Sequence, residues 1–523
     1  MKKTLTLILA VVMTISLFAG CTGGKNEEIA NFNPDLKLQD LGGLKLPLAE
    51  NNDKITWSVD SSDTDLNNKY VVQKLREATG VNLELLILAQ ATSAQKINVL
   101  AASNQLPDIV GQGLDPAFAE DLCLQGAFAA VEDYIDVLPN FKRTFVDGEA
   151  NWVFKSRIAA DGKLYGFYGW DFNRDVNTGA TMYRKDIFDK HGIKMWNSPE
   201  TFYQALKQLK ELYPDSTPYS IKSGDGIFNS WAQYWGMKGQ EPYYNEEDGK
   251  WYFTDVQSEY KEILDFMLKC YNEGLIDPEF LTNTQAAWTA KMTQADKVFV
   301  TTDWIGRMDT FKTQTADTVP DYDLRFANPF GPDQILTTAS QLCWPRHVSS
   351  QSKNIETCFK LLDFCLAPAG KAIITMGIEG ETYEIDENGM AKYLDPEYEG
   401  KNPTTSELQD KYGMFVQGMY LSFDRRSAYF NFTEREQEAQ DYAKDPAHMA
   451  PMDPELVFTE EENTKKNELI ATFMKAGREF ATKYLLNNGG QKEWDEWVKQ
   501  AEKLGYKELE KIYNDAQARY DAQ

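Results

Sequence analysis

Apolar segments with strand spacing and segments with helical spacing alternate near the start of the chain's body. Residues 55–59 and 81–87 alternate apolar and polar side chains, which is typical of strands, and residues 109–110 predict a third strand. Residues 70–78 and 95–103 place their apolar side chains on one helical face. Strands that alternate with helices in this way predict α/β layers, in which helices cover a sheet.

The middle of the chain is richer in helical patterns. Ser198 can accept a hydrogen bond from a free N–H at a helix start, and Pro199 loses nothing at the first helical position. A helix is therefore expected to begin there. Further helices are predicted over residues 260–271, 355–366 and 506–520, and a buried strand over residues 297–301.

The first residues have the pattern of an export signal. Lys2 and Lys3 precede an apolar run over residues 5–18, which is shorter than the roughly 20 residues that a spanning helix needs. The run ends in Leu-Phe-Ala-Gly-Cys, which resembles a bacterial lipobox, with Phe18 where that motif usually has Leu. We expect a signal peptide over residues 1–20 and a lipid anchor on Cys21, followed by a polar, Gly-rich tether to about residue 50.

The length of the chain indicates more than one domain, and its charge argues against nucleic-acid binding. A body of about 470 residues is too long for one core, so two or more domains are expected. The 54 basic and 80 acidic residues give a net charge of −26, which repels nucleic acid and anionic lipid. Nucleic-acid binding is therefore not expected.

Cysteine and histidine usage argues against a metal site or a disulfide framework. Beyond Cys21 there are five widely spaced cysteines, and we interpret them as buried free thiols. The three histidines lie far apart and show no zinc spacing. Acidic stretches over residues 60–65 and 245–250 lack the ligand spacing of a calcium loop. No metal or cofactor is expected.

Five stretches carry a resemblance to a known family. The chain resembles the extracellular solute-binding proteins of ABC sugar importers, family 1, and within them the large lipoprotein group. These stretches follow the family's order along most of the chain: residues 101–109 (AASNQLPDI), 162–166 (GKLYG), 183–192 (YRKDIFDKHG), 272–280 (NEGLIDPEF) and 377–383 (GIEGETY).

The resemblance implies an α/β fold with two lobes joined by a hinge, as in type II periplasmic binding proteins. It places the passages between the lobes near residues 168–179, 327–331 and 391–403. The expected division is lobe 1 over residues 51–169 and 329–395, and lobe 2 over residues 170–328 and 396–523, with a helical C-terminus.

Binding of sugar requires flat aromatic faces for the rings and side chains that meet two hydroxyls at once. Three clusters combine these residue types: one enters the first expected passage, one directly follows the strand predicted to end at Thr301, and one comes soon after the second passage. A pair of tryptophans four residues apart could also share a helix face. Trp304 resembles the stacking aromatic at the matching strand end in maltose-binding proteins. The candidate ligand-binding residues are Tyr168, Trp170, Asp171, Arg174, Trp231, Trp235, Asp303, Trp304, Trp344 and Arg346.

The resemblance implies a monomeric, non-catalytic protein at the extracytoplasmic face of the cell membrane, which captures an oligosaccharide and delivers it to an ABC transporter permease. Three alternatives stay open: a binding protein for a peptide or another small solute, a surface sensor, and a glycosidase with two facing carboxylates. The arginines near the expected cleft (Arg174, Arg307 and Arg346) leave an acidic sugar possible.

Overall fold

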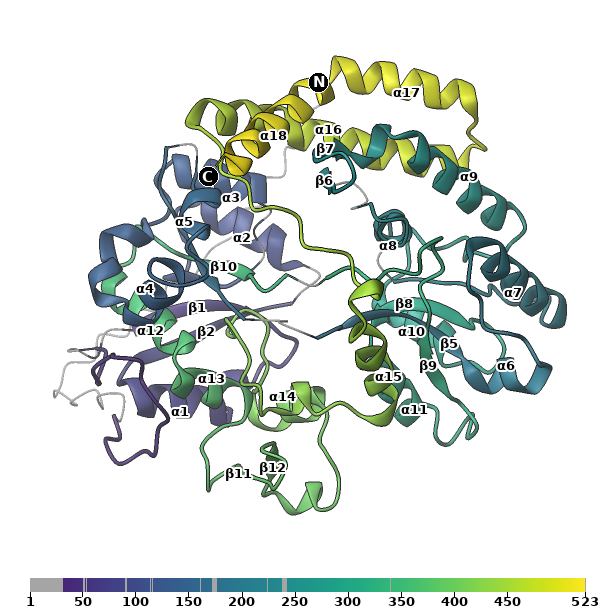
Figure 1. The fold of residues 1–523 in the computed structure, drawn as a ribbon. Helices are drawn as coiled ribbons and strands as arrows, with labels where there is room; N and C mark the ends of the chain where they lie inside the picture. The colour runs from purple at the N-terminus through teal and green to yellow at the C-terminus, as the bar shows by residue number, and fades with distance from the viewer. Residues whose placement is uncertain are drawn as a thin grey trace, which may run out of the picture.

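The computed structural model describes residues 32–49, 52, 54–89, 92–112, 114, 116–159, 161–171, 176–222, 224–237, 242–338 and 340–522. The expected signal peptide (1–20), the expected lipidation site Cys21 and the candidate Arg174 lie outside these residues. The described residues form two lobes of helices and strands, which Figure 1 shows side by side.

A five-stranded sheet organises lobe 1, with the strand order β2-β1-β3-β10-β4. The strands β1 (Lys54–Asp60), β2 (Asn82–Leu88) and β3 (Ile109–Val110) run parallel to one another. Strand β10 (Cys343–Val348) is antiparallel both to β3 and to β4 (Gly166–Gly169). The parallel pairing confirms the α/β layers that the alternating sequence predicts.

Helices of lobe 1 cover this sheet. Helix α1 (Tyr70–Thr79) buries Val71, Val72 and Leu75 and ends at Gly80, whose φ of +72° suits a helix terminus. The other elements of lobe 1 are α2 (Ser93–Ala102), α3 (Pro116–Leu124), α4 (Pro139–Phe145), α5 (Val153–Ser156), α12 (Ile355–Leu366), α13 (Pro368–Thr375), β11 (Tyr383–Ile385), β12 (Ala391–Tyr393) and α14 (Thr405–Tyr412).

Lobe 2 is built on a three-stranded antiparallel sheet of order β8-β5-β9. Its strands are β5 (Gly179–Arg184), β8 (Val300–Trp304) and β9 (Leu324–Ala327), with a separate hairpin of β6 (Pro242–Asn245) and β7 (Lys250–Phe253). Strand β8 begins later than the strand expected over residues 297–301.

Most of lobe 2 is helical. Helix α7 (Pro199–Leu212) starts as predicted, with the Ser198 hydroxyl accepting from the Thr201 N–H. The other helices are α6 (Lys185–His191), α8 (Gly226–Gln233), α9 (Ser258–Asn272), α10 (Gln285–Met292), α11 (Arg307–Gln314), α15 (Glu434–Ala443), α16 (Glu460–Leu486), α17 (Gln491–Lys503) and α18 (Tyr506–Asp521).

The chain passes between the lobes three times before α15. Strands β4 and β5 belong to different sheets, so residues 170–178 connect the lobes, and residues 328–342 connect β9 to β10. The third passage lies later than the expected 391–403. Residues from Tyr398 to Phe423 contribute apolar side chains to the core of lobe 1, whereas α15 lies against β9 in lobe 2.

The expected tether also differs from the structure. Of its residues, 32–49 lie on lobe 1, where Leu44 and Leu48 are buried in the core. The Asn33 N–H donates to the Glu77 carbonyl, and the Leu48 N–H donates to the Thr79 carbonyl. Closely spaced leucines in this segment supply the apolar contacts that a solvated tether lacks.

All five cysteines of the described residues are buried free thiols, as predicted. Within the described ranges, no helix has both the length and the apolar character needed to cross a membrane.

Candidate functional site

In lobe 1, several strand termini meet at one edge of the sheet. Strand β1 ends at Asp60 and β3 at Val110, while Gly169 at the end of β4 pairs with Cys343 at the start of β10. In open α/β sheets, ligands bind beyond the carboxyl ends of the strands. Because two passages between the lobes leave from this edge, it is the natural place for a site shared by both lobes.

Two candidate tryptophans lie at this edge. Trp344 follows Cys343 and is 60% exposed. Trp170 follows Gly169, and its ring N–H donates to Glu149 at 3.0 Å. Next to them, Tyr168 is half-buried, and burial raises the pKa of its hydroxyl to about 12, so this group remains a neutral hydrogen-bond donor.

In lobe 2, the main candidate ligand-binding residue, Trp304, lies at the other end of the first passage. Trp304 ends β8 and pairs with Gly179, the first residue of β5. Its half-buried ring lies over Gly306, where an added Cβ would come within 2.4–2.6 Å of the ring atoms. Glycine at position 306 therefore allows the Trp304 ring to occupy this place.

Asp303 lies beside Trp304 in a small ionic cluster. Its carboxylate is 3.1 Å from the Lys222 ammonium and 3.4 Å from the Arg307 guanidinium, and its side chain is almost covered. Both cations also lie about 5.7 Å from the centre of the Trp288 ring. The cluster thus fixes two cationic donors close to the strand end that carries Trp304.

Trp231 and Arg346, two of the expected contact residues, are fully buried. Trp231 packs among Phe330 and Tyr219 in the core of lobe 2, so its ring offers no face to a ligand. Arg346 donates from its guanidinium to the backbone carbonyls of Gly418 and Tyr420. In this arrangement Trp231 supports the core and Arg346 holds a loop, and neither side chain reaches the surface.

Trp235 and Asp171 occupy intermediate positions. Trp235 is half-buried against Phe266 and Phe330 of lobe 2. Asp171 follows Trp170 with a φ of +62°, and its carboxylate lies 2.9 Å from the Arg425 guanidinium. Asp171 therefore belongs to the edge of lobe 1 but already has a cationic partner.

Residues 418–432 form part of this edge, although none of them is among the expected contact residues. The Gly418 and Tyr420 carbonyls are held by Arg346, and the Leu421 carbonyl comes so close to Gly169 that a Cβ there would lie 1.7 Å from it. The segment brings further half-buried aromatic rings and a cation to the edge, namely Tyr420, Tyr429, Phe430 and Arg425. The density of aromatic residues between positions 420 and 432 is the signal that could have identified it.

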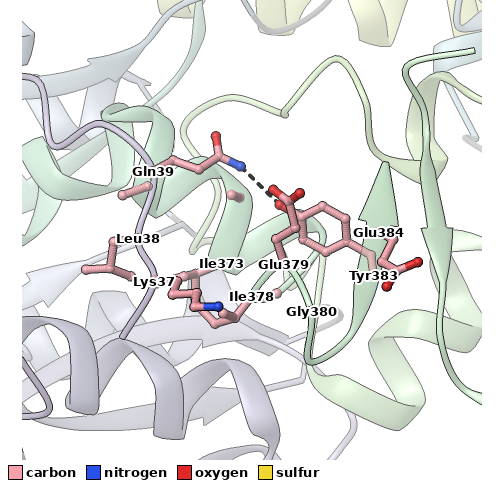
Figure 2. A pocket seen from close by; sticks show the side chains of 12 residues that line it. Lys37, Leu38, Gln39, Ile373, Ile378, Glu379, Gly380, Tyr383 and Glu384 are labelled. Carbon is pink, nitrogen blue, oxygen red and sulfur yellow. Dashed lines mark hydrogen bonds between the residues drawn. The ribbon is translucent and has the colours of Figure 1, made fainter. Parts of the chain in front are cut away.

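Two cavities of the described residues lie away from these strand ends. One, of about 390 Å³, lies between residues 37–39, α13 and β11. Figure 2 shows its polar rim, where the Gln39 amide donates to the Tyr383 hydroxyl at 3.0 Å. The other, of about 320 Å³, lies between α5 and the C-terminal part of lobe 2.

The described residues contain no group of three or more His, Cys, Asp or Glu side chains placed to hold an ion.

Comparison with known proteins gives relatives over nearly the whole chain. The fructooligosaccharide ABC transporter substrate-binding protein FusA of Streptococcus pneumoniae serotype 4 is 27% identical, over 97% of this chain and 98% of FusA. The polygalacturonan/rhamnogalacturonan-binding protein YtcQ of Bacillus subtilis is 22% identical over 53% of each chain. Lipoprotein LipO of Bacillus subtilis is 22% identical over 98% of this chain and 97% of LipO.

Solved structures show the same two-lobed fold. The alginate-binding protein AlgQ2 matches with a TM-score of 0.75 and 22% identity, over 90% of this chain and 99% of AlgQ2. FusA of S. pneumoniae, in complex with kestose, matches with a TM-score of 0.70 and 21% identity, over 90% of this chain and all of that one. The model of the bacterial extracellular solute-binding proteins matches residues 70–380, more than half of the 523 residues, and the chain belongs to this family.

Proposed function

We propose that this protein captures an oligosaccharide between its two lobes and delivers it to the permease of an ABC transporter. It would do so at the extracytoplasmic face of the membrane, anchored through a lipid on Cys21. FusA, YtcQ and AlgQ2 carry names that state binding of oligo- or polysaccharides, and FusA is named as a component of an ABC transporter. LipO is named as a lipoprotein.

The observation that carries the proposal is the placement of aromatic rings at both ends of one passage. Trp170 begins the passage over residues 170–178, Trp344 lies on the neighbouring strand, and Trp304 pairs with Gly179, the residue that follows the passage. Sugar rings stack on such faces, because their C–H surfaces are apolar while their hydroxyls lie at the edge. A ligand bound here would contact both lobes.

The polar groups around these rings suit hydroxyl recognition. Lys222 and Arg307 are held by Asp303 in lobe 2, and Arg425 is held by Asp171 in lobe 1. A cation that is already paired keeps a fixed position and still has N–H groups to donate. Hydroxyls that found no partner in a closed site would be costly to bury, which provides specificity.

Binding would proceed by closure of the lobes. A ligand that contacts both lobes in the closed arrangement and only one in the open arrangement shifts the population toward closure by that difference in contacts. The passages act as the hinge, and a permease would recognise the closed shape. Capture and delivery of a ligand involve no catalytic step in this proposal, and Asp171 and Asp303 each lie in an ion pair with a neighbouring cation.

The chain without residues 1–21 provides a direct test. Its melting temperature is measured against a panel of neutral and acidic oligosaccharides, with peptides as controls. A ligand that binds only the folded state raises this temperature as its concentration exceeds the Kd. A rise with one class of sugar, while that sugar is recovered intact, is the expected result. A response to peptides alone would overturn the carbohydrate proposal.

A further inference from the structure

The cavity of about 320 Å³ lies at a second contact between the lobes, away from the passages. Helix α5 and the residues before it form its wall on lobe 1, and the segment before α16 together with the end of α18 forms the opposite wall. Figure 1 shows α5 close to the C-terminal end of α18. We name this space the seam cavity; its lining includes Trp152, Lys155, Glu455, Phe458, Arg519 and Tyr520.

Contacting aromatic rings link the seam cavity to the candidate site. The Trp152 ring lies 6.2 Å from the Trp170 ring, edge to face, with an interplanar angle of 69°. Trp170 belongs to the strand-end edge, whereas Trp152 lines the seam cavity. Across the cavity, Phe458 is half-buried and Tyr520 is 47% exposed. A chain of sugar rings could therefore follow an aromatic surface from one place to the other.

Among the described residues that line the seam cavity, the one charged group outside an ion pair is positive. Arg519 is paired with Glu462, and Glu455 lies 3.4 Å from Arg157. The Lys155 side chain is exposed, and its ammonium has no ion pair or hydrogen bond with any described residue. A free cation next to aromatic faces favours a ligand that carries a carboxylate.

We propose that the seam cavity is a distal subsite for one carboxylate-bearing sugar ring, of the same oligosaccharide whose other rings bind at the strand ends. This inference rests on the proposed function. It specifies in addition that the ligand is long enough to reach both places and that it carries a carboxylate. The sugar ring lies between Trp152 and Tyr520, and its carboxylate accepts from Lys155. Because the two walls belong to different lobes, filling the cavity also favours one arrangement of the lobes.

The test uses galacturonate oligomers as probes, from dimer to hexamer, together with the same oligomers after reduction of their carboxyl groups. Calorimetric Kd values are measured for the wild type, Lys155→Gln, Tyr520→Ala and a matched control. The control is Lys475→Gln, which removes an exposed positive charge on α16 that does not line the cavity. Unfolding curves without ligand verify that each variant folds.

We expect the wild type to bind the longer galacturonates more tightly than the dimer. Lys155→Gln and Tyr520→Ala should lose about tenfold in affinity for the long oligomers and leave the dimer unchanged. The carboxyl-reduced oligomers should bind equally to the wild type and Lys155→Gln. Lys475→Gln should behave as the wild type throughout.

Other outcomes separate this inference from the proposed function. Equal affinity of the wild type and Lys155→Gln for long galacturonates overturns the subsite, as does a wild type that binds neutral oligosaccharides and rejects galacturonates. If Tyr520→Ala does not fold, Lys155→Gln decides alone. Failure of the wild type to bind any sugar of the wider panel overturns the proposed function itself.

Discussion

The two lobes present aromatic side chains to the same passage but support them in different ways. Lobe 1 uses the ends of a five-stranded, partly parallel sheet, reinforced by a loop whose carbonyls are held by the buried Arg346. Lobe 2 uses one strand end of a three-stranded antiparallel sheet, where Trp304 lies over Gly306 beside the ion pairs of Asp303.

The two lobes therefore differ in how far the candidate site depends on contacts between distant parts of the chain. In lobe 1 the site edge depends on long-range contacts, because residues 418–421 must reach β4 and β10. In lobe 2 the site is local in sequence, since residues 303–307 contain the ring, the glycine and one of the ion pairs. Substitutions in the long-range contacts of lobe 1 should therefore lower the free energy of unfolding. Substitutions within residues 303–307 of lobe 2 should mainly weaken ligand binding.

The largest effect is expected from Arg346→Met. The change leaves the Gly418 and Tyr420 carbonyls without their buried donor, which should lower the free energy of unfolding by about 3–4 kcal/mol. Denaturant unfolding gives the measurement, with Lys475→Met as a control that removes an exposed charge. A loss below about 1 kcal/mol would show that the loop does not depend on this side chain.

The second prediction concerns a buried carboxyl in lobe 2. Asp255 is fully buried, neither carboxyl oxygen has a hydrogen-bond partner among the described residues, and burial raises its pKa to about 8 despite the positive charge of Arg478. Between about pH 4 and 8 the unfolded chain releases this proton while the folded chain keeps it. Asp255 therefore makes the folded state less stable as pH rises through this window, by about 1 kcal/mol per pH unit.

Asp255→Asn should remove this slope. The measurement compares the free energies of unfolding of the wild type and the variant at pH 5 and pH 7, and the advantage of the variant should grow with pH. Identical pH dependence in both proteins would contradict a protonated Asp255.

The third prediction addresses Trp304. Trp304→Ala removes a stacking face and should weaken sugar binding by about 1–3 kcal/mol, with little change in the free energy of unfolding because the ring is only half-buried. Titration calorimetry with the sugar identified by the panel measures the loss. Trp304→Phe keeps a smaller face and should lose less. An unchanged affinity in a folded Trp304→Ala protein would remove Trp304 from the site.

The smallest effect is expected at the seam between the lobes. Glu455→Gln breaks the partly exposed pair with Arg157, which should change the free energy of unfolding by less than about 1 kcal/mol, because water and salt screen such pairs. Thermal unfolding at low and high salt provides the check. A larger loss would indicate that the seam locks the lobes together.

The sequence predicted the local elements well, because their signals lie within a few residues. The helix expected over residues 70–78 forms Tyr70–Thr79, and Ser198 caps α7. The tryptophans chosen because they follow predicted strands or lie at expected passages, Trp170, Trp304 and Trp344, lie at the strand ends.

The features that the sequence did not predict depend on contacts between residues far apart in the chain, and a local sequence pattern contains no information about such contacts. The burial of Trp231 and Arg346 is set by residues far away in the chain, such as Phe330 and Gly418. Residues 396–423 show no regular apolar period, so their place in lobe 1 could not be derived from spacing. The segment over residues 32–49 was misassigned because its leucines act through long-range packing.

The end of α18 lies beside α5, although the two belong to different lobes. A dye attached after Asp521 and a second dye on α5 would thus form a pair whose energy transfer follows the relative movement of the lobes. Capture of a ligand by the proposed closure of the lobes would change the distance between the two dyes. This chain could in that way be converted into an optical sensor for its own ligand without alteration of the strand ends that carry Trp170, Trp304 and Trp344.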